Sequence, residues 1–433
     1  MERHEHEGEK ALVAKATLKG DKSDDPLAEI NALAATAGAE VVDSVVQNLS
    51  RPQPGTYMGR GKVGEVASRA NELDVDVVIA DNELSPAQER NLEKATSRKV
   101  VDRTQLIMDI FSQRARSRQA KLQVELAQLR YSLPRLKRMW THLDRFKAGI
   151  GMRGPGEMQL EEDKRLIGRR IQKLKHELRK LEDKRHASTM RRSNEFVVAL
   201  VGYTNAGKST LLNRLTDSEE LVEDKLFATL DTRVRQWPLN DKRYVLASDT
   251  VGFIRNLPHH LVASFHATLS EVKEADLLLH VIDAGSIEAS QHMDVVRDVL
   301  RRLECQDTET WLVFNKWDSV PEERLIEARH LAEKKLKNER VLRLSAHTGE
   351  GIDTLTEAVL DRLQQDDCDV ELDVPHQRGD VISYIQDNGQ VRSVEYETSG
   401  VAIKASLSPT RLAKLKAIYP EGFPPPTKEV WEE

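Results

Sequence analysis

The sequence predicts a multidomain α/β protein, and three observations lead to that prediction. The chain has 433 residues, which is too long for one ordinary hydrophobic core. Apolar runs alternate with helical patterns in two separate stretches, which is typical of parallel sheets covered by helices. Between those stretches lie two amphipathic helical patterns joined by a glycine-rich segment. We therefore expect a small α/β domain, a helical hairpin, a larger α/β domain and a small α+β domain.

Composition excludes several classes of protein. Hydrophobic residues make up 39% and charged residues 31% of the chain, as in soluble proteins with long exposed helices. No run of about 18 apolar residues is present to span a bilayer, and the N-terminal stretch lacks the apolar core of a secretory signal. Cys305 and Cys368 lack the spacing of a metal site or a disulfide framework. We expect a monomeric cytoplasmic protein, with peripheral contact to a membrane left open.

Charge is distributed unevenly along the chain. The formal net charge is −6, from 65 basic and 71 acidic residues. Residues 118–193, however, hold 21 Lys and Arg against 9 Asp and Glu, so this segment carries +12 and the rest of the chain −18. Exposed helices usually balance the two signs. A strongly basic segment in an acidic protein indicates an anionic partner such as a nucleic acid.

Residues 1–117 are expected to form the small N-terminal α/β domain. From residue 40 to residue 101, the strand patterns EVVDSVV, VDVVIA and KVVD alternate with the helix patterns KVGEVASRANEL and SPAQERNLEKA. Gly59, Gly61 and Gly64 match the G-x-G-x-x-G pattern of dinucleotide-binding loops, but no clear buried strand precedes them. We interpret this stretch as a structural turn before a helix, and ATP binding by this domain stays open.

Residues 118–193 are expected to form a basic helical hairpin. Apolar side chains recur at intervals of four and three residues over 122–143, and the same spacing returns over 160–181. This is the pattern of a coiled-coil seam, so two helices joined by a short loop should pack antiparallel along it. The glycine-rich loop between them, residues 148–156, would form the tip of this arm. Pro134 is expected to kink the first helix.

Residues 194–365 are expected to form a P-loop domain. The stretch LVGYTNAGKST contains a strand, then the pattern G-x-x-x-x-G-K-S, then the start of a helix. Gly202 and Gly207 would let backbone N–H groups face phosphates. Lys208 would neutralise the β- and γ-phosphates, and Ser209 would ligate Mg²⁺. The other loop residues expected to contact the nucleotide are Tyr203, Thr204, Asn205, Ala206 and Thr210.

Three further stretches at strand ends complete a nucleotide site. In LASDTVG, Asp249 is placed to reach Mg²⁺ through water, and Gly252 to offer its N–H to the γ-phosphate. In VFNKWD, Asp318 can accept two hydrogen bonds from the edge of guanine, whereas adenine has no exocyclic amine there, so Asp318 would select GTP over ATP. The remaining residues expected around the base are Asn315, Lys316, Ser345 and Ala346, the last two from RLSAHTG.

The order and spacing of these stretches resemble the translation-factor-like branch of P-loop GTPases over about residues 194–365. The resemblance implies hydrolysis of GTP to GDP with Mg²⁺, and a switch threonine between the phosphate loop and Asp249. The stretch DKLFATLDTR supplies Thr229 for that role, with Thr232 as the alternative. The expected catalytic residues are Lys208, Gly252 and Thr229, and the expected metal ligands are Ser209, Thr229 and Asp249.

Phe253 stands where many of these relatives have a glutamine. A phenyl ring cannot hydrogen-bond the attacking water, so hydrolysis should be slow until a partner or an ion completes the site. A subset of relatives without that glutamine uses an asparagine before the A-G-K of the loop to hold K⁺. Asn205 occupies that position here, so we hypothesise that K⁺ is a second cofactor.

Residues 366–433 are expected to form a small α+β domain. DVISYIQDNG reads as a helix stopped by Gly389, QVRSVEYETSGVAIKASLS as two strands, and PTRLAKLKAIY as a short helix. No motif in this segment indicates a role.

Three features together resemble the HflX family of ribosome-associated GTPases: the basic arm, the stretch GIGMRGPGEMQLEEDKR, and GTYMGRGKVGEV in the first domain. The resemblance covers about residues 55–365. It implies binding to the large ribosomal subunit and its RNA, with the tip reaching toward the peptidyl-transferase region and the GTP-bound protein separating ribosomal subunits. Under that reading Arg153, Gly154 and Gly156 contact ribosomal RNA.

Two other classes of function remain open from the sequence. One is a signalling GTPase whose arm binds a protein effector. The other is an ATP-dependent RNA remodeller that uses the N-terminal domain. Binding that weakens strongly with salt, and hydrolysis stimulated by ribosomes, would favour the ribosomal class over both.

Overall fold

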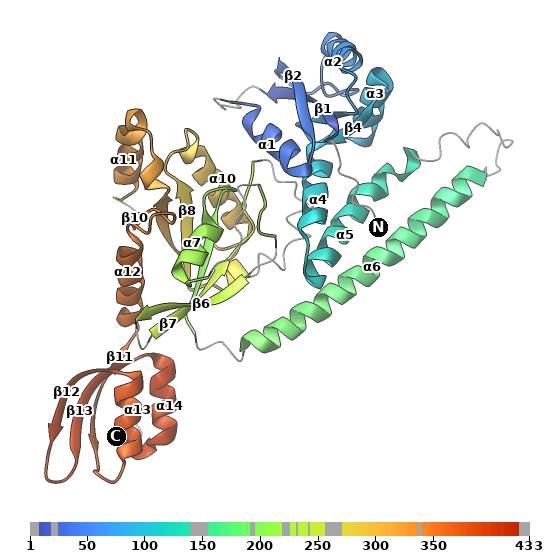
Figure 1. Ribbon diagram of the computed structural model, residues 1–433. Helices are drawn as coiled ribbons and strands as arrows, with labels where there is room; N and C mark the ends of the chain where they lie inside the picture. The colour runs from blue at the N-terminus through green and yellow to red at the C-terminus, as the bar shows by residue number, and fades with distance from the viewer. Residues whose placement is uncertain are drawn as a thin grey trace, which may run out of the picture.

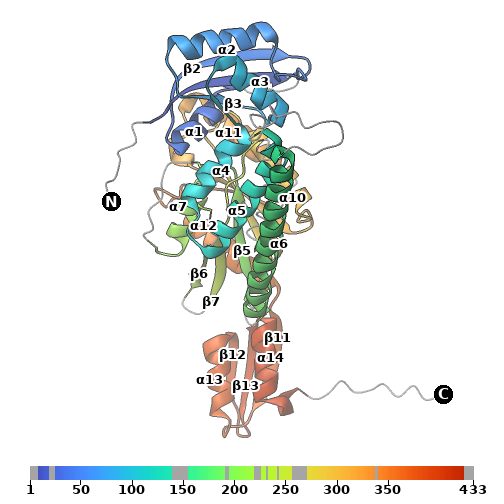
Figure 2. The same cartoon turned by 90° about the vertical axis from the view of Figure 1, so that its right-hand side faces the viewer.

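The computed structural model describes residues 8–18, 25–138, 155–190, 195–218, 226–230, 233–240, 243–255, 271–336 and 340–423. Three sheets and a long helical arm make up this part of the chain (Figure 1). The N-terminal sheet and the C-terminal sheet lie at opposite ends, with the largest sheet and the arm between them (Figure 2). The predicted multidomain α/β fold is confirmed. In the described part of the chain, no helix has the length and apolar character needed to cross a membrane.

The N-terminal domain is a parallel four-stranded sheet with helices packed on it, in the strand order β2-β1-β3-β4. The predicted Ser85 and Pro86 do begin a helix: the Ser85 hydroxyl accepts from the Gln88 N–H, and the Gln88 side chain accepts from the Ser85 N–H. Elements not expected from the sequence are the central strand β1, and helices α1 and α4. The elements are β1 Lys10–Leu18, α1 Ala28–Ala37, β2 Glu40–Leu49, α2 Arg60–Glu72, β3 Val77–Ala80, α3 Pro86–Thr96, β4 Lys99–Asp102 and α4 Arg103–Arg114.

The glycines of the G-x-G-x-x-G match do not form a nucleotide cradle. Gly59 precedes helix α2, while Gly61 and Gly64 lie inside it. A Cβ at Gly61 or at Gly64 would meet nothing within 4 Å, so no close backbone approach requires glycine at either position. The interpretation of this stretch as structural and not nucleotide-binding agrees with the structure, but the helix begins at Arg60 and so includes Gly61 and Gly64 instead of following them.

The arm consists of α5 (Arg118–Ser132), a 3₁₀ segment (Leu133–Arg138) and α6 (Pro155–Met190). Near the start of α5, Arg118 pairs with Glu177, at 3.4 Å; further along α5, Glu125 pairs with Arg170, at 2.6 Å. Partner numbers fall as residue numbers in α5 rise, so the helices are antiparallel. Their seam is an apolar cluster formed by Leu122, Leu126, Ile171, Leu174 and Leu178.

Two expectations about the arm are wrong, and part of a third lies outside the described residues. The first α-helix does not continue through Pro134 with a kink; it ends at Ser132, because proline has no N–H to donate to the preceding turn and its ring clashes there. Gly156 belongs to the first turn of α6 and not to a loop, since Pro155 is well suited to the start of a helix. Arg153 and Gly154 lie outside the described residues.

The largest sheet has six strands in the order β10-β9-β8-β5-β7-β6, and all but β6 run parallel to their neighbours. The five apolar runs predicted as buried strands form β5, β7, β8, β9 and β10; the antiparallel edge strand β6 was not expected. The elements are β5 Val197–Gly202, α7 Lys208–Leu215, β6 Arg233–Asn240, β7 Arg243–Asp249, β8 Leu277–Asp283, α10 Ala289–Arg302, β9 Glu309–Asn315, η2 Trp317–Ser319, α11 Glu322–Leu336, β10 Val341–Arg343 and α12 Ile352–Gln365.

The C-terminal domain is a three-stranded antiparallel sheet, β11-β13-β12, with two helices on it. The predicted helix before Gly389, the two strands and the last helix are all present, and β11 is an additional strand. The elements are β11 Cys368–Val374, α13 Gly379–Asn388, β12 Gln390–Tyr396, β13 Val401–Leu407, α14 Pro409–Ile418 and η3 Pro420–Gly422.

Candidate nucleotide site

A cavity of about 380 Å³ lies at the carboxyl ends of the parallel strands of the largest sheet. In open parallel sheets this edge is where ligands bind, because the loops that follow the strands converge there. Thirteen of the residues predicted to form the nucleotide site line the cavity: Thr204, Asn205, Gly207, Lys208, Ser209, Thr210, Thr229, Gly252, Asn315, Lys316, Asp318, Ser345 and Ala346. The fold therefore gathers stretches that are more than 100 residues apart in the sequence.

The phosphate loop closes tightly around its own lysine. Helix α7 begins at Lys208, directly after Gly207, and the Lys208 ammonium donates to the Tyr203 carbonyl at 2.8 Å. Gly207 has a φ of +88°, and a Cβ there would lie 2.3 Å from Asn315 Nδ2. Only glycine fits this turn, because both the backbone conformation and the contact exclude a side chain. The N-terminal N–H groups of α7 thus face the cavity, where an anion is stabilised.

Lys208 and Asp249 are opposite charges buried at the floor of the site. Burial lowers the pKa of Lys208 to about 8, and the nearby Asp249 carboxylate opposes that shift. Burial also raises the pKa of Asp249, against the lowering influence of Lys208 and of the Ser209 and Thr229 hydroxyls. Both shifts have the same cause: each charged form is short of solvation in the protein alone. A phosphate and a cation would supply the missing charge.

Three oxygen-bearing side chains meet beside the lysine. The Ser209 hydroxyl donates to Asp249 Oδ2 at 2.5 Å, and the Ser209 and Thr229 hydroxyl oxygens lie 2.7 Å apart. Asp249 Oδ1 is buried without a hydrogen-bond partner among the described residues. Two hydroxyls and a carboxylate form a hard oxygen donor set, which suits Mg²⁺. The residues present therefore fit the metal ion that the sequence predicts.

The opposite end of the cavity carries the residues expected around the base. The Asn315 side chain donates to the Ala206 carbonyl at 2.9 Å and accepts from the Ala346 N–H at 2.9 Å, so it joins the phosphate loop to the end of the last strand. Lys316 pairs with Asp283 at 2.9 Å. The Asp318 carboxylate lies exposed on the cavity wall and has no partner within the described ranges. Its oxygens are available to a ligand.

Gly252 lies against the phosphate loop, whereas the side chain of its neighbour Phe253 lies in the apolar core. A Cβ at Gly252 would lie 2.7 Å from Thr204 Cγ2 and 3.1 Å from Lys208 Nζ, so this backbone passes directly over the phosphate loop. Phe253 is instead buried in an apolar cluster with Ala199 and Val201, and its backbone pairs with Gly202 and Thr204. The phenyl ring therefore lies away from the cavity, in agreement with the expectation that it cannot orient a water molecule there.

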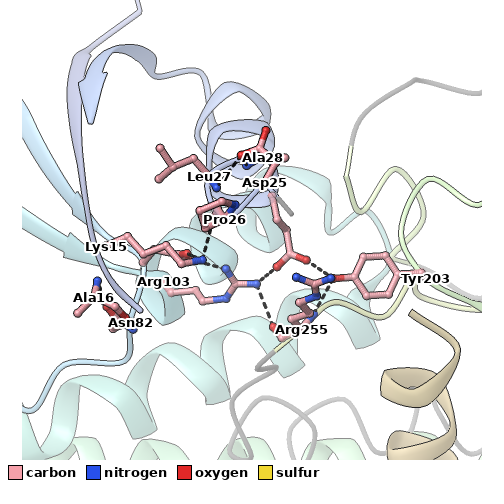
Figure 3. A network of polar contacts seen from close by, with 12 residues as sticks. Lys15, Ala16, Asp25, Pro26, Leu27, Ala28, Asn82, Arg103, Tyr203 and Arg255 are labelled. Carbon is pink, nitrogen blue, oxygen red and sulfur yellow. Dashed lines mark hydrogen bonds and ion pairs between the residues drawn. The ribbon is translucent and has the colours of Figure 1, made fainter. Parts of the chain in front are cut away.

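Some predicted residues do not line the cavity, and some lining residues were not predicted. Gly202, Tyr203, Ala206 and Asp249 are not among the residues that line the cavity, and the Tyr203 ring points toward the N-terminal domain (Figure 3). The lining residues that the sequence analysis missed are Phe227, Ala228, Thr250, Ser319 and His347. All five adjoin predicted motifs in the sequence, so proximity to the motifs was the only signal for them.

Taken together, the parallel sheet, the phosphate loop and the convergent motifs define a P-loop GTPase. Family models match most of the chain: GTP-binding GTPase N-terminal over residues 24–112, GTP-binding GTPase Middle Region over 114–192, 50S ribosome-binding GTPase over 197–316, and HflX C-terminal domain over 330–426.

Curated relatives are similar to this chain over nine-tenths or more of its length. The GTPase HflX of Lacrimispora saccharolytica is 43% identical over 411 residues, which cover 94% of this chain and 96% of that protein. The GTPase HflX of Escherichia coli is 43% identical over 392 residues, 90% of each chain. The chain belongs to the HflX family of GTPases. Among solved structures, the crystal structure of the SsGBP and GDP complex is 25% identical, with a TM-score of 0.48 over 82% of this chain and 99% of that one.

Proposed function

We propose that this GTPase binds the large ribosomal subunit through its N-terminal domain and basic arm, and that its GTP-bound form separates ribosomal subunits. Hydrolysis is stimulated by the ribosome and resets the protein. The description of the matching family model, a 50S ribosome-binding GTPase, supports the choice of partner. The observation that carries the proposal is the long basic arm attached to an otherwise acidic protein.

We assign each group of the site a role from its chemistry. Lys208 and the α7 N-terminus hold the β- and γ-phosphates, and the Gly252 N–H donates to the γ-phosphate. Ser209, Asp249 and Thr229 would hold Mg²⁺, which draws charge from the phosphates when it is bound. Asp318 accepts from the guanine edge. Since Phe253 leaves no side chain to position water, we expect the ribosome to supply the remaining stabilisation, together with K⁺ if Asn205 binds it.

The exposed face of α6 is suited to a phosphate backbone. Several of its basic residues are exposed and have no ion-pair partner in the described part of the chain, among them Arg169, Lys173, Arg179 and Lys180. Unpaired surface cations that contact nucleic acid displace the counterions condensed on its phosphates, which gives affinity that falls steeply with salt. Helix α6 lies on the outer side of α5, away from the three sheets, so a large ribonucleoprotein can reach it (Figure 1).

An ATP site in the N-terminal domain is disfavoured by what fills the relevant edge of its sheet. Asp81 directly follows the end of β3, where it pairs with Lys15 of the neighbouring strand β1 at 2.8 Å and with Arg103 at 2.6 Å. Arg103 also pairs with Glu29 of α1, so two cations face two carboxylates and this group presents no unpaired cation to a triphosphate. We therefore do not retain the ATP-driven remodeller as a second candidate.

Charge reversal on α6 tests the proposal. The double variant Arg169→Glu/Lys173→Glu should bind purified large subunits at least roughly tenfold more weakly at moderate salt. Each phosphate contact that is lost leaves counterions on the RNA that would otherwise be released on binding. Arg301→Glu/Arg329→Glu is the matched control, since it changes the charge equally at exposed positions of α10 and α11. Sedimentation with large subunits measures both. Equal binding by the two double variants would contradict a role for the arm.

A further inference from the structure

The two segments that carry Thr229 and Gly252 are packed against the N-terminal domain. One apolar cluster contains buried residues of both domains, with Ile107 and Phe111 from α4 and Phe227, Leu230 and Ile254 from the GTPase domain. The rings of Phe111 and Phe227 meet edge to face, with centroids 4.7 Å apart and planes at 81°. Phe227 is only 2% exposed and lies two residues before Thr229. The switch threonine therefore sits on a segment whose neighbouring ring is held by another domain.

Polar contacts extend this junction to the segment after Gly252. Arg103, the first residue of α4, donates to the Arg255 carbonyl at 2.9 Å and also pairs with Glu29 of α1 (Figure 3). The Tyr203 hydroxyl donates to Glu29 and accepts from the Arg255 N–H at 2.9 Å. Both backbone groups of Arg255, three residues beyond Gly252, are thus held by side chains of other segments.

A second contact, made by the face of its ring, also holds Tyr203 in place. It stacks on His292 of α10, with ring centroids 3.8 Å apart and an angle of 14° between the planes. Tyr203 is also the residue whose carbonyl accepts from Lys208. A single residue of the phosphate loop therefore touches the catalytic lysine through its backbone and the N-terminal domain through its hydroxyl.

We propose that Phe111 and Arg103 are positioning residues that couple the N-terminal domain to the nucleotide. They hold the two segments that carry Thr229 and Gly252, the residues expected to respond to the γ-phosphate. The nucleotide in the site therefore controls how firmly the N-terminal domain packs on the GTPase domain. The inference rests on the switch roles proposed above for Thr229 and Gly252. A GTP γ-phosphate orders both segments through those residues, and GDP does not. Because coupling between two binding events is reciprocal, docking of α4 must then strengthen binding of the triphosphate relative to the diphosphate.

This coupling would link the binding of the nucleotide to the binding of the ribosome. The N-terminal domain and the arm are continuous through α4 and α5, so a change in docking at Phe111 alters the position of the basic surface relative to the GTPase domain. A nucleotide-dependent change in that geometry is what a protein needs in order to bind its partner in one state and leave it in another.

Phe111→Ala tests the apolar half of the junction. We expect the ratio of affinities for the nonhydrolysable analogue GMPPNP and for GDP to fall about tenfold, in the ordinary range of coupling between sites. The control is Leu92→Ala, which truncates a buried side chain of α3 in a cluster drawn from the N-terminal domain alone. Leu92→Ala should lower stability comparably and leave the ratio within twofold of the parent. An equal fall in both variants, or in neither, would overturn the proposal.

Tyr203→Phe tests the polar half with less risk to folding, because it keeps the ring that stacks on His292 and removes only the hydroxyl. It should lower the same ratio by about threefold to tenfold. Hydrogen exchange gives the reciprocal readout in the full-length parent: amides of α4 should exchange more slowly with GMPPNP bound than with GDP bound, and this difference should vanish in Phe111→Ala. Exchange of α4 that is the same with both nucleotides in the parent would contradict coupling.

Thr229→Ala separates failure of this inference from failure of the switch assignment. If Thr229→Ala lowers the GMPPNP preference and Phe111→Ala does not, Thr229 is the switch and the N-terminal domain plays no part in it. If Thr229→Ala leaves the preference unchanged, the switch assignment itself is wrong.

Discussion

The hydroxyl oxygens of Ser209 and Thr229 lie 2.7 Å apart, although one residue belongs to helix α7 and the other to a segment 20 residues further along the chain. Asp249 completes the group through a 2.5 Å contact with Ser209. Three oxygen-bearing side chains from three separate segments are therefore gathered at the end of the phosphate loop. Such an arrangement serves a hard cation.

Ser209→Ala should raise the Mg²⁺ concentration needed for half-maximal GTP hydrolysis by roughly tenfold or more, since loss even of an outer-shell partner can weaken metal binding by that factor. The hydroxyl is small and partly buried, so the fold should tolerate the change. A magnesium titration of the hydrolysis rate measures the effect. An unchanged Mg²⁺ requirement would remove Ser209 from the metal site.

Asp318→Asn should cost about 2 to 4 kcal/mol of GTP affinity, because two hydrogen bonds to a charged acceptor are lost. Xanthosine triphosphate carries an oxygen where guanine carries the amine, so the variant should accept it much better than the parent does. Competition of both nucleotides against a fluorescent GDP derivative reports the two affinities. Unchanged GTP affinity would mean that Asp318 does not read the base.

The affinity for GDP should fall as pH rises through 8. Burial lowers the pKa of Lys208 to about 8 in the protein alone, so the charged form that attracts phosphate is lost above that pH. If the bound state keeps Lys208 charged, affinity should drop about tenfold between pH 7 and pH 9. Lys208→Ala is the control, because it removes the lysine and keeps the other titratable groups of the protein and of GDP. The same pH dependence in the parent and in Lys208→Ala would rule out Lys208 as the source.

Hydrolysis should be faster in K⁺ than in Na⁺. Asn205 lines the cavity in the phosphate loop. A cation bound there would add positive charge next to the phosphates of the nucleotide, where the Phe253 ring offers no stabilising group. Asn205→Ala should abolish the difference between the two ions while leaving GDP binding nearly unchanged. Equal rates in the two buffers for the parent would dispose of the K⁺ hypothesis.

Shortening the tip of the arm should show whether the tip is needed for subunit separation and not for nucleotide binding. Replacing residues 148–154 by a plain four-residue turn leaves the helix seam and the phosphate loop intact, so GTP binding should not change. Subunit separation should be lost, because the tip no longer reaches its contact. Arg153→Ala should be milder, weakening binding to large subunits by about 1 to 3 kcal/mol if the guanidinium stacks on or pairs with a base. If both variants separate subunits like the parent, the loop is only a connector.

The sequence predicted the fold class and the gathering of motifs because both depend on local patterns. Apolar runs with polar ends indicated the strands, and a phosphate loop has a nearly fixed sequence. The junction between domains could not be predicted: Phe111 and Phe227 meet through tertiary packing alone, and nothing near either residue indicates a partner 116 positions away. Strand β1 was missed for a related reason, since its KALVAKATL run is interrupted by Lys15 and its burial comes from strands on both sides.

The central claim is that the ribosome completes this GTPase. The decisive measurement is the GTP hydrolysis rate of the full chain with and without purified large subunits, at a fixed K⁺ concentration and at two salt concentrations. We expect stimulation of roughly 1,000-fold or more at low salt, at the lower end of what a supplied positive charge can contribute, and much less at high salt. The arm variant Arg169→Glu/Lys173→Glu should need a higher concentration of subunits for the same rate. A rate that does not change when large subunits are added would contradict the account.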